Sequence, residues 1–442
     1  MYTNKRIVKG LSASMEERKN PQEDLDEKRE GEEYSFLQEV IKDEADSIKV
    51  LKNGVFRMIG YGVVFGLAAS IVFCAAKPWI ENRFNSNPTQ IEIPKDEEEK
   101  EKDPESESEQ QEKKKKTKTI DADSYRYAIQ KLSRVGKDTE KCMAVIGCVT
   151  ERGGQEKSVR DSKAGIIIAD NGRELLILSH ILNVKKNEDI QATFADGRSY
   201  KAAVKVRDLN LGFCVYGITR EMIDPATWSA IGTISIGSSN SVENGDPVIV
   251  LGKPFGEDNA VSYGTVAADE GYVEIADGHY RLIYTNIPCD GNGSGAILNR
   301  YGQLIGVIDQ SVLEEGSNGR VGGYGISDIK DIIELLSNGA VIPYTGIYGM
   351  DVTEKLAAKG MPQGVYVREV AADSPAMAAG IQSGDVIVGI DGEGIGSLAN
   401  YHNILLKKSE GSMIKLRGCR QGAGDEYVEI DFEVIVGSRN KD

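Results

Sequence analysis

The sequence predicts a mostly β protein preceded by one membrane-spanning helix, and three observations support this fold class. From about residue 125 onward, short β-rich runs alternate with turn signals, a spacing typical of all-β barrels or sandwiches rather than of βαβ units. The uncharged stretch 58–76 has nineteen residues, enough for a helix to cross the roughly 30 Å hydrocarbon core of a bilayer. Between these two regions the chain is highly charged and has almost no large apolar residues.

Composition limits the class of protein. The chain has 442 residues, of which 40% are hydrophobic and 28% charged, so it is long enough for two or three domains. Its formal net charge of -16 opposes non-specific binding to nucleic acid, and we expect no nucleic-acid partner. The six cysteines form no CxxC pair and the chain has only three histidines, so we predict no metal site and no cofactor.

The N-terminal part of the chain divides into three segments. Residues 1–53 are predicted to be a charged cytoplasmic tail with an amphipathic helix, and residues 54–77 a transmembrane helix. Residues 78–124 carry blocks of both charge signs and are expected to be a disordered linker. The span has more basic residues before it than after it, which favours a cytoplasmic N-terminus. We therefore expect a single-pass protein of the cell membrane whose larger part is extracytoplasmic.

The following region, residues 125–338, is long enough for two barrels. Apolar runs of strand length alternate with Gly, Asn and Asp turn signals throughout it. The runs are "MAVIGCVT", "AGIIIAD", "LLILSHIL", "IQATF", "YKAAVKV", "LGFCVYGI", "DPVIVLG", "AVSYGTVAA", "RLIYTNI", "GAILN", "QLIGVI" and "VGGYGIS".

Several motifs in this region resemble those of HtrA/DegP-like serine proteases, whose peptidase domain is a chymotrypsin-like double β-barrel. "AGIIIADNGRELLILSHIL" is similar to the hairpin that delivers the catalytic histidine and places His180 at that position. In "DGRSYKAAVKVRDLNLGFCVYGI", Asp196, Gly197, Arg198 and Asp208 stand at the family's spacing, but Gly212 falls where the family has its triad aspartate. "VIVLGKPFG", "VSYGTVAA" and "GAILNRYGQLIGVI" follow in family order.

The serine loop "DGNGSGAILN" is displaced by one residue relative to the family's form. Counting back from Asn299 puts the nucleophile position on Gly293, whereas counting forward from "LIYT" puts it on Ser294. The adjacent Gly-Asn pair and the strand that follows both favour Gly293. A catalytic triad requires each side chain at a defined place relative to the others. A serine one residue away directs its hydroxyl elsewhere and shifts the N–H groups of the oxyanion hole.

Other side chains are candidate substitutes for the missing triad residues. Asp208 is a weak candidate for the missing acid and is more simply a turn residue, and Asp290 is a second carboxylate close to the loop. Cys289 lies four residues before the nucleophile position, outside the pattern of cysteine proteases. His279 is expected on a surface hairpin and His402 in the C-terminal region, and neither is predicted to be catalytic.

The C-terminal section, residues 342–437, resembles a PDZ domain of the HtrA type. "SPAMAAGIQSGDVIVGIDG" carries the likeness, and "YTGI" stands in the place of the carboxylate-binding loop. The peptide-binding residues that this resemblance implies are Tyr344, Thr345, Gly346 and Ile347. Backbone N–H groups in such a loop bind a peptide's terminal carboxylate while the peptide adds a strand to the sheet edge.

The uncharged stretch, the resemblance and the departures from it at Gly212 and Gly293 together predict a membrane-anchored HtrA-like protein that is a catalytically impaired pseudoprotease. We expect it to bind peptide C-termini or unfolded segments through the PDZ domain, and to associate with further copies of itself or with an active protease. The alternative is an active membrane-anchored serine endopeptidase of extracytoplasmic protein quality control that uses His180 and Ser294.

Overall fold

The computed structural model describes residue 70 and residues 88–96, 122–150, 158–313, 319–424 and 426–439. The chain divides into two units, Met1–Asn85 and Ser86–Asp442, and only the second is described beyond a single residue. No helix in the described ranges is long and apolar enough to cross a membrane. The predicted tail and the predicted span at 54–77 lie outside these ranges, apart from Ser70.

The first half of the double barrel is a seven-stranded antiparallel sheet in the order β5-β4-β1-β2-β3-β7-β6. Continuous apolar runs form its central strands because both of their faces are covered, and β3 has five successive buried residues. Gly172, with φ of +85°, makes the turn between β2 and β3. The strands are β1 (Met143–Thr150), β2 (Ser158–Asp170), β3 (Glu174–His180), β4 (Asp189–Phe194), β5 (Ser199–Lys201), β6 (Ala203–Asp208) and β7 (Phe213–Thr219).

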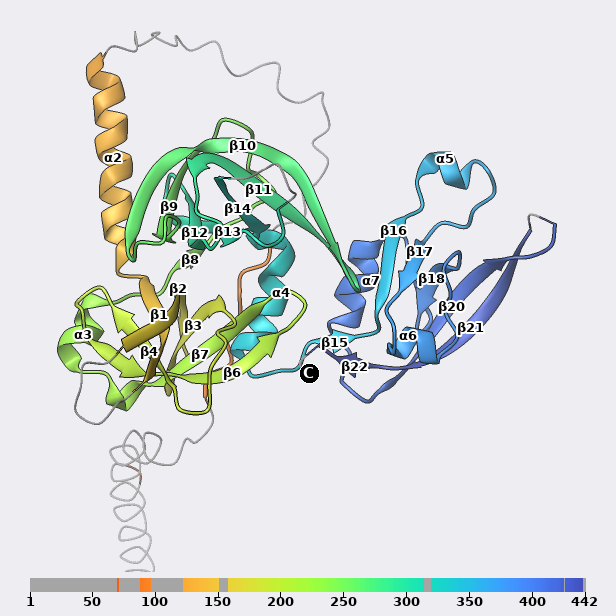
Figure 1. The fold of residues 1–442 in the computed structure, drawn as a ribbon. Helices are drawn as coiled ribbons and strands as arrows, with labels where there is room; N and C mark the ends of the chain where they lie inside the picture. Colours follow the sequence, from red (N-terminus) through yellow and green to blue (C-terminus); the bar gives the residue numbers. More distant parts are fainter. Residues whose placement is uncertain are drawn as a thin grey trace, which may run out of the picture. The chain divides into compact units, whose positions relative to one another are not determined.

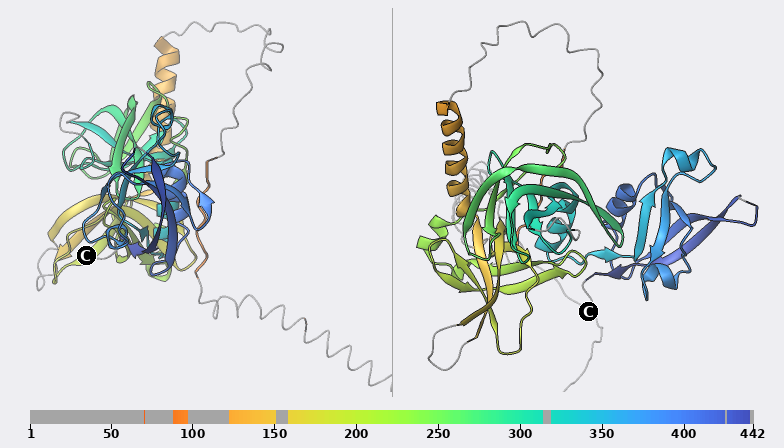
Figure 2. Two further views of the ribbon diagram at one scale, coloured as in Figure 1. Left: turned by 90° about the vertical axis from the view of Figure 1, so that its right-hand side faces the viewer. Right: turned by 45° about the horizontal axis from the view of Figure 1, so that its top comes forward.

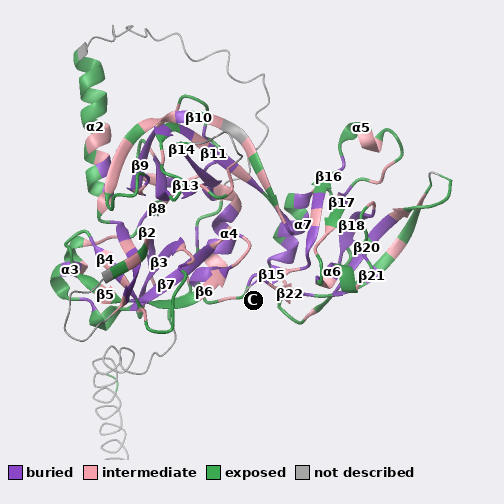
Figure 3. Ribbon diagram, in the orientation of Figure 1, coloured by how far each residue is buried: buried purple, intermediate pink, exposed green. Residues whose placement is uncertain are grey.

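The second half is a sheet in the order β12-β9-β10-β11-β14-β13-β8, and an additional pairing of β12 with β13 closes it (Figure 1). Strands β9 to β14 coincide with or extend the predicted apolar runs. Strands β9, β12, β13 and β14 are largely buried, whereas β10 is mostly half-buried or exposed (Figure 3). They are β8 (Ser235–Ile236), β9 (Pro247–Lys253), β10 (Ala260–Ile275), β11 (Gly278–Pro288), β12 (Ser294–Asn299), β13 (Gln303–Asp309) and β14 (Arg320–Gly325).

Helices absent from the sequence-based prediction surround the barrels. They are α2 (Ala122–Glu140), α3 (Pro225–Ala230) and α4 (Ile326–Ser337), with a short 3₁₀ turn at Arg220–Met222. Helix α4 follows β14 directly and buries isoleucines and leucine at helical spacing against the barrel core.

Part of the segment predicted to be a disordered linker is ordered. Residues 88–96 form an extended segment along α4, where Ile93 is buried. The backbone N–H of Ile93 donates to Glu334 Oε2 at 2.9 Å, and Lys330 pairs with Asp96 at 2.6 Å. The apolar residues in "QIEIP" explain the difference, because burying them offsets part of the ordering entropy.

The C-terminal domain has its own core. A hydrophobic cluster drawn entirely from residues 347–436 fills it. The main sheet has the order β16-β17-β18-β20-β21, with β19 on β18, and β15 pairs separately with β22. Its elements are β15 (Pro343–Tyr344), β16 (Ile347–Asp351), α5 (Glu354–Ala357), β17 (Val365–Val370), α6 (Pro375–Ala378), β18 (Val386–Ile390), β19 (Glu393–Gly394), α7 (Leu398–Leu405), β20 (Met413–Gln421), β21 (Tyr427–Ile435) and β22 (Gly437–Ser438).

The long hairpin of β10 and β11 reaches this C-terminal domain. Figures 1 and 2 show its curved strands running from the second barrel to a tip beside α7. The strands pair Ile275 with Gly278, so the tip is a two-residue turn of Ala276 and Asp277. Asp277 has φ of +65°, a left-handed conformation that Asp tolerates in tight turns.

Candidate active site and peptide-binding loop

His180 lies at the end of β3, at the edge of the first barrel. Its side chain is 15% exposed, and its ring makes a T-shaped contact with Phe213 at a centroid distance of 5.2 Å. The hydroxyl of Tyr216 donates to the His180 backbone oxygen at 2.9 Å. Strand pairing and these contacts fix the imidazole in a position that solvent still reaches.

The position predicted for the triad acid holds a glycine in left-handed backbone conformation. Gly212 has φ of +74°, and its carbonyl oxygen accepts a hydrogen bond from Ile181 N at 2.9 Å. A Cβ atom at Gly212 would meet no other atom within 4 Å, so the site has room for a side chain. The backbone conformation, rather than crowding, is what disfavours a larger residue there.

Asp208 is a turn residue. One of its carboxylate oxygens accepts hydrogen bonds from the N–H groups of Asn210 at 2.9 Å and Leu211 at 3.3 Å. The other lies 3.6 Å from a guanidinium nitrogen of Arg439, and both side chains are fully buried. The carboxylate therefore serves the β6–β7 turn and a buried ion pair.

A different acid lies beside the histidine. Asp309, at the end of β13 in the second barrel, places Oδ2 3.7 Å from His180 Nε2. Burial alone would raise the pKa of this carboxyl, but His180 and hydrogen bonds from Ser311 hold it below the usual range. Sequence reasoning missed Asp309, whose only signal is a carboxylate that ends the apolar run "LIGVI".

The side of the imidazole that Asp309 faces bears on the chemistry. In a Ser-His-Asp triad the acid holds Nδ1, while Nε2 accepts the proton of the nucleophile. Here the carboxylate lies at Nε2, where a nucleophile would need the free lone pair. Asp309 therefore faces the wrong side of the His180 ring to serve as the acid of a triad.

Ser294 points into the protein. It is the first residue of β12, its exposed fraction is 0%, and its Oγ accepts a hydrogen bond from Ala164 N at 2.9 Å. It pairs across the sheet with Asp309 and Lys253, yet within the described residues no hydrogen bond joins its hydroxyl to His180. The hydroxyl thus ties the loop to β2, at the junction of the two barrels.

Asp290 occupies the donors of the serine loop. An oxyanion hole uses the N–H of the nucleophile residue and that of the residue two places earlier. In this loop Gly293 N donates to the Asp290 backbone oxygen at 2.9 Å, and Gly291 N donates to Asp290 Oδ1 at 2.7 Å. Both N–H groups already have acceptors within the loop, so they are not pre-organised for an oxyanion.

Cys289 fills the space beside Gly293. A Cβ atom on Gly293 would overlap with the Cys289 sulfur. Burial, together with the charge of Asp290, raises the pKa of this half-buried thiol to about 11. The thiol is therefore protonated at neutral pH, and the thiolate needed for nucleophilic attack is scarce.

The PDZ-like loop holds a carboxylate. Thr345 N and Gly346 N donate to Asp277 Oδ2 at 2.8 and 2.9 Å, and Ile347 N donates to Oδ1 at 3.0 Å. The Thr345 hydroxyl also donates to Asp277 Oδ1. Three of the four predicted peptide-binding residues are brought together in this way, whereas Tyr344 pairs with Gly437 in β15–β22.

The other two histidines lie around the same hairpin. His402, on α7, is buried and its Nδ1–H donates to the Asp277 backbone oxygen at 2.8 Å. Burial, reinforced by the positive charge of Arg439, lowers its pKa to about 4. His279 is exposed on β11 and stacks on Tyr272. Neither His402 nor His279 contacts the serine loop in the interactions described here.

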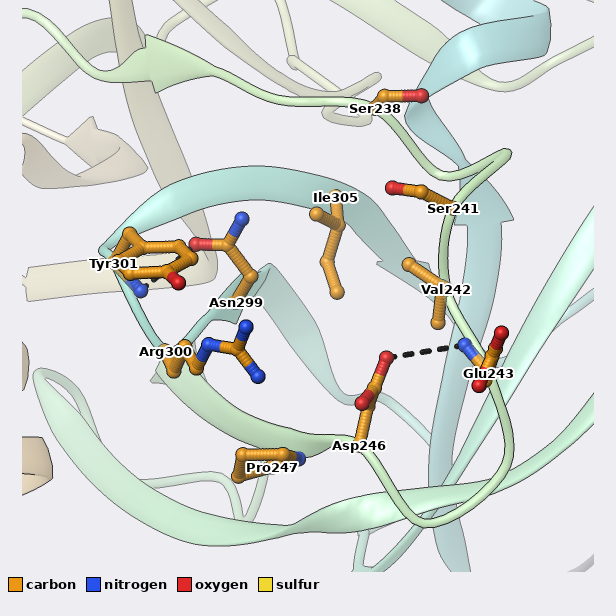
Figure 4. Close-up of a pocket in the computed structure, with 10 residues that line it drawn as sticks. All are labelled: Ser238, Ser241, Val242, Glu243, Asp246, Pro247, Asn299, Arg300, Tyr301 and Ile305. Carbon is orange, nitrogen blue, oxygen red and sulfur yellow. Dashed lines mark hydrogen bonds between the residues drawn. The ribbon is translucent and has the colours of Figure 1, made fainter. Parts of the chain in front are cut away.

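A polar pocket of about 310 Å³ opens elsewhere on the second barrel (Figure 4). Asn299, Arg300 and Tyr301 line one side of it. Ser294 is the first residue of β12 and Asn299 is the last, so the pocket lies about 16 Å along the strand from the serine. It belongs neither to the serine loop nor to the PDZ-like loop. Among the described residues no cluster of His, Cys, Asp and Glu is arranged to hold a metal ion.

Comparison with known proteins agrees with this architecture. A trypsin-like peptidase domain model matches residues 164–307, and a PDZ domain model matches residues 343–432. The chain is 26% identical over 288 residues to the serine protease Do-like HtrA of Bacillus subtilis (strain 168), which covers 60% of this chain and 62% of that protein. It is also 26% identical over 301 residues to the periplasmic serine endoprotease DegP of Escherichia coli (strain K12), covering 65% and 60%.

The fold has counterparts among solved structures. A structure of the HtrA-type protease AlgW with a tripeptide superimposes with a TM-score of 0.50 and 21% identity, covering 70% of this chain and 98% of that one. The chain spans less than two thirds of the length of both relatives named above. The order of domains, the family matches and the fold agree: the chain carries a trypsin-like peptidase domain followed by a PDZ domain, and it is similar to the HtrA/DegP serine proteases.

Proposed function

We propose that this protein is a membrane-anchored, catalytically impaired HtrA-like protein that binds peptide C-termini through its PDZ domain. The main support for impaired catalysis is the position of the Ser294 hydroxyl. Its hydroxyl is buried and accepts a hydrogen bond from Ala164 N, so it does not face a substrate.

Three further features support impaired catalysis over the alternative of an active endopeptidase. Gly212 supplies no carboxylate, and in a Ser-His-Asp triad loss of the acid alone lowers turnover by about 10⁴-fold. Asp309 faces the ring nitrogen that would accept the nucleophile's proton. With Gly293 as the nucleophile position, Asp290 occupies the two N–H groups that would stabilise an oxyanion.

The geometry of the PDZ loop supports peptide binding. Three successive N–H groups, from Thr345 to Ile347, already hold a carboxylate, the group that a peptide C-terminus presents. Strand β16 follows directly and pairs with β17 on one side. Asp277 N already binds Ile347 O on the other side, but beyond Ile347 no strand among the described residues pairs with that edge, which leaves it available for an added strand. A fold that has lost catalysis retains such binding surfaces because binding and chemistry are separate properties of a site.

Membrane anchoring is part of the proposal. It rests on the uncharged stretch 58–76 and on the excess of basic residues before it, which favour a cytoplasmic N-terminus and extracytoplasmic domains. The charged linker between span and barrels is suited to hold the domains away from a membrane surface. Partners of the proposed protein are peptides or unfolded C-termini, further copies of the chain, or an active protease.

Labelling with a fluorophosphonate tests the loss of catalysis. The full chain should neither react with this serine-directed probe nor hydrolyse an unfolded protein substrate such as casein, while an active HtrA protease run in parallel does both. Labelling of the wild-type chain that disappears in both Ser294→Ala and His180→Ala would establish an active endopeptidase and overturn the proposal.

A further inference from the structure

We propose that Asp277 is an internal ligand of the PDZ domain: its carboxylate closes the peptide-binding loop, and a peptide C-terminus enters only by displacing the β10–β11 turn. This inference rests on the proposed function of the loop in peptide binding. It adds that a carboxylate of the peptidase domain competes with peptide C-termini for the loop.

The contacts of Asp277 reproduce those of a bound C-terminus. Both carboxylate oxygens accept N–H groups of the loop, at 2.8 to 3.0 Å, and the Thr345 hydroxyl adds a fourth donor. The backbone N–H of Asp277 donates to Ile347 O at 2.7 Å, the kind of bond that the last residue of an added strand makes to the sheet edge. Asp277 therefore supplies both the carboxylate and the backbone pairing of a terminal residue.

The turn itself does not require a carboxylate. At φ of +65° a glycine or an asparagine is suited to this two-residue turn. What the carboxylate adds is its set of contacts with the PDZ loop, where Asp277 and Thr345 both have an exposed fraction of 0%. Five donors, including the Tyr401 hydroxyl at 3.4 Å, converge on one buried carboxylate, so the loop is a complete anion site that is already filled.

Groups of the PDZ domain hold the turn by its backbone as well. His402 Nδ1–H donates to the Asp277 oxygen at 2.8 Å, and a guanidinium nitrogen of Arg439 donates to the Ala276 oxygen at 2.7 Å. A peptide must break these bonds in addition to displacing the carboxylate. The apparent affinity for peptides is therefore the intrinsic affinity multiplied by the fraction of molecules in which the loop is open.

The same hairpin provides a matched control. Glu274, on β10, forms an exposed ion pair with Arg368 on β17, and so also joins the hairpin to the PDZ domain. Glu274→Gln weakens a contact between the same two elements but leaves the Asp277 carboxylate in the loop. Asp277→Gly empties the loop and suits the left-handed turn, whereas Asp277→Asn keeps the shape and loses the charge.

Peptide binding by fluorescence anisotropy tests the inference. The probes are fluorescein-labelled decapeptides ending in different apolar residues with a free carboxylate, each compared with its C-terminal amide. The proteins are the full chain, its Asp277→Gly, Asp277→Asn and Glu274→Gln variants, and the segment 340–442, whose hydrophobic core is its own. Circular dichroism melts confirm that each variant is folded.

We expect the isolated segment and full-length Asp277→Gly to bind the free-acid peptides at least about tenfold more tightly than the wild-type chain. Asp277→Asn should lie between them, and Glu274→Gln should match the wild type. Equal affinity of the wild-type chain, Asp277→Gly and the isolated segment would overturn the internal-ligand inference while leaving peptide binding intact. If neither the segment nor Asp277→Gly prefers free acids to amides, the proposed peptide-binding function itself fails.

Discussion

Replacing His402 should flatten the acid side of the protein's stability curve. The imidazole is buried on α7, and burial together with Arg439 lowers its pKa from 6.5 to about 4. Between these two pH values the unfolded chain binds a proton that the folded chain does not. The stabilisation by neutral His402 is thus complete above pH 6.5 and is lost as pH falls toward 4. At about 1.4 kcal/mol per pKa unit, this loss is on the order of 3 kcal/mol.

Chemical unfolding at a series of pH values measures this effect. Between pH 7 and pH 4 the wild-type chain should lose about 3 kcal/mol more of its unfolding free energy than His402→Gln does. His279→Gln is the matched control, since His279 is exposed on β11 and its replacement should leave the wild-type slope unchanged. The reasoning is refuted if His402→Gln retains the full acid slope, or if His279→Gln removes it.

Three further predictions concern the folded state. Arg439→Met should lower the unfolding free energy by about 3–5 kcal/mol because it leaves the buried Asp208 carboxylate unpaired, and adding Asp208→Asn should recover much of the loss in denaturant titrations. Tyr324→Phe should be neutral or stabilise by up to about 1 kcal/mol, because the buried Tyr324 hydroxyl has no hydrogen-bond partner in the described part of the chain; a clear loss in melting temperature would show that the hydroxyl is used. Gly293→Ser should destabilise by about 1–3 kcal/mol through overlap with the Cys289 sulfur, and Cys289→Ala should reverse most of this in the double variant.

The strands could be predicted because local pattern determines them. Apolar runs such as "ELLILSH" become buried strands, and turn residues such as Gly172 mark where they reverse. Helix α4 was missed because it directly follows β14 without an intervening loop, so its first apolar residues continue the apolar run of the strand. The predicted membrane span falls outside the described residues and remains a prediction.

Candidate site residues that lie within a sequence motif could be predicted. Contacts between residues that are distant in the chain could not. Sequence motifs predicted His180 as the retained histidine, Gly212 as the position of the lost acid and a displaced serine loop, and these role assignments stay predictions. The contact of His180 with Asp309 joins two barrels, and that of Asp277 with Thr345 joins residues 68 apart in the chain. An Asp-Gly pair predicts a hairpin turn, but nothing local indicates what the tip of that hairpin will touch.

The filled PDZ loop has a consequence for which ligands can compete. A carboxylate tethered in the same molecule competes at an effective concentration that is typically about millimolar for short connections. A single free C-terminus at micromolar concentration is outcompeted unless it gains additional binding along the open edge of β16. By mass action, a high local concentration of chain ends competes with the tethered carboxylate more effectively than a dilute peptide does. Asp277 would thereby set a threshold concentration of peptide C-termini, below which the PDZ loop stays occupied by its own carboxylate.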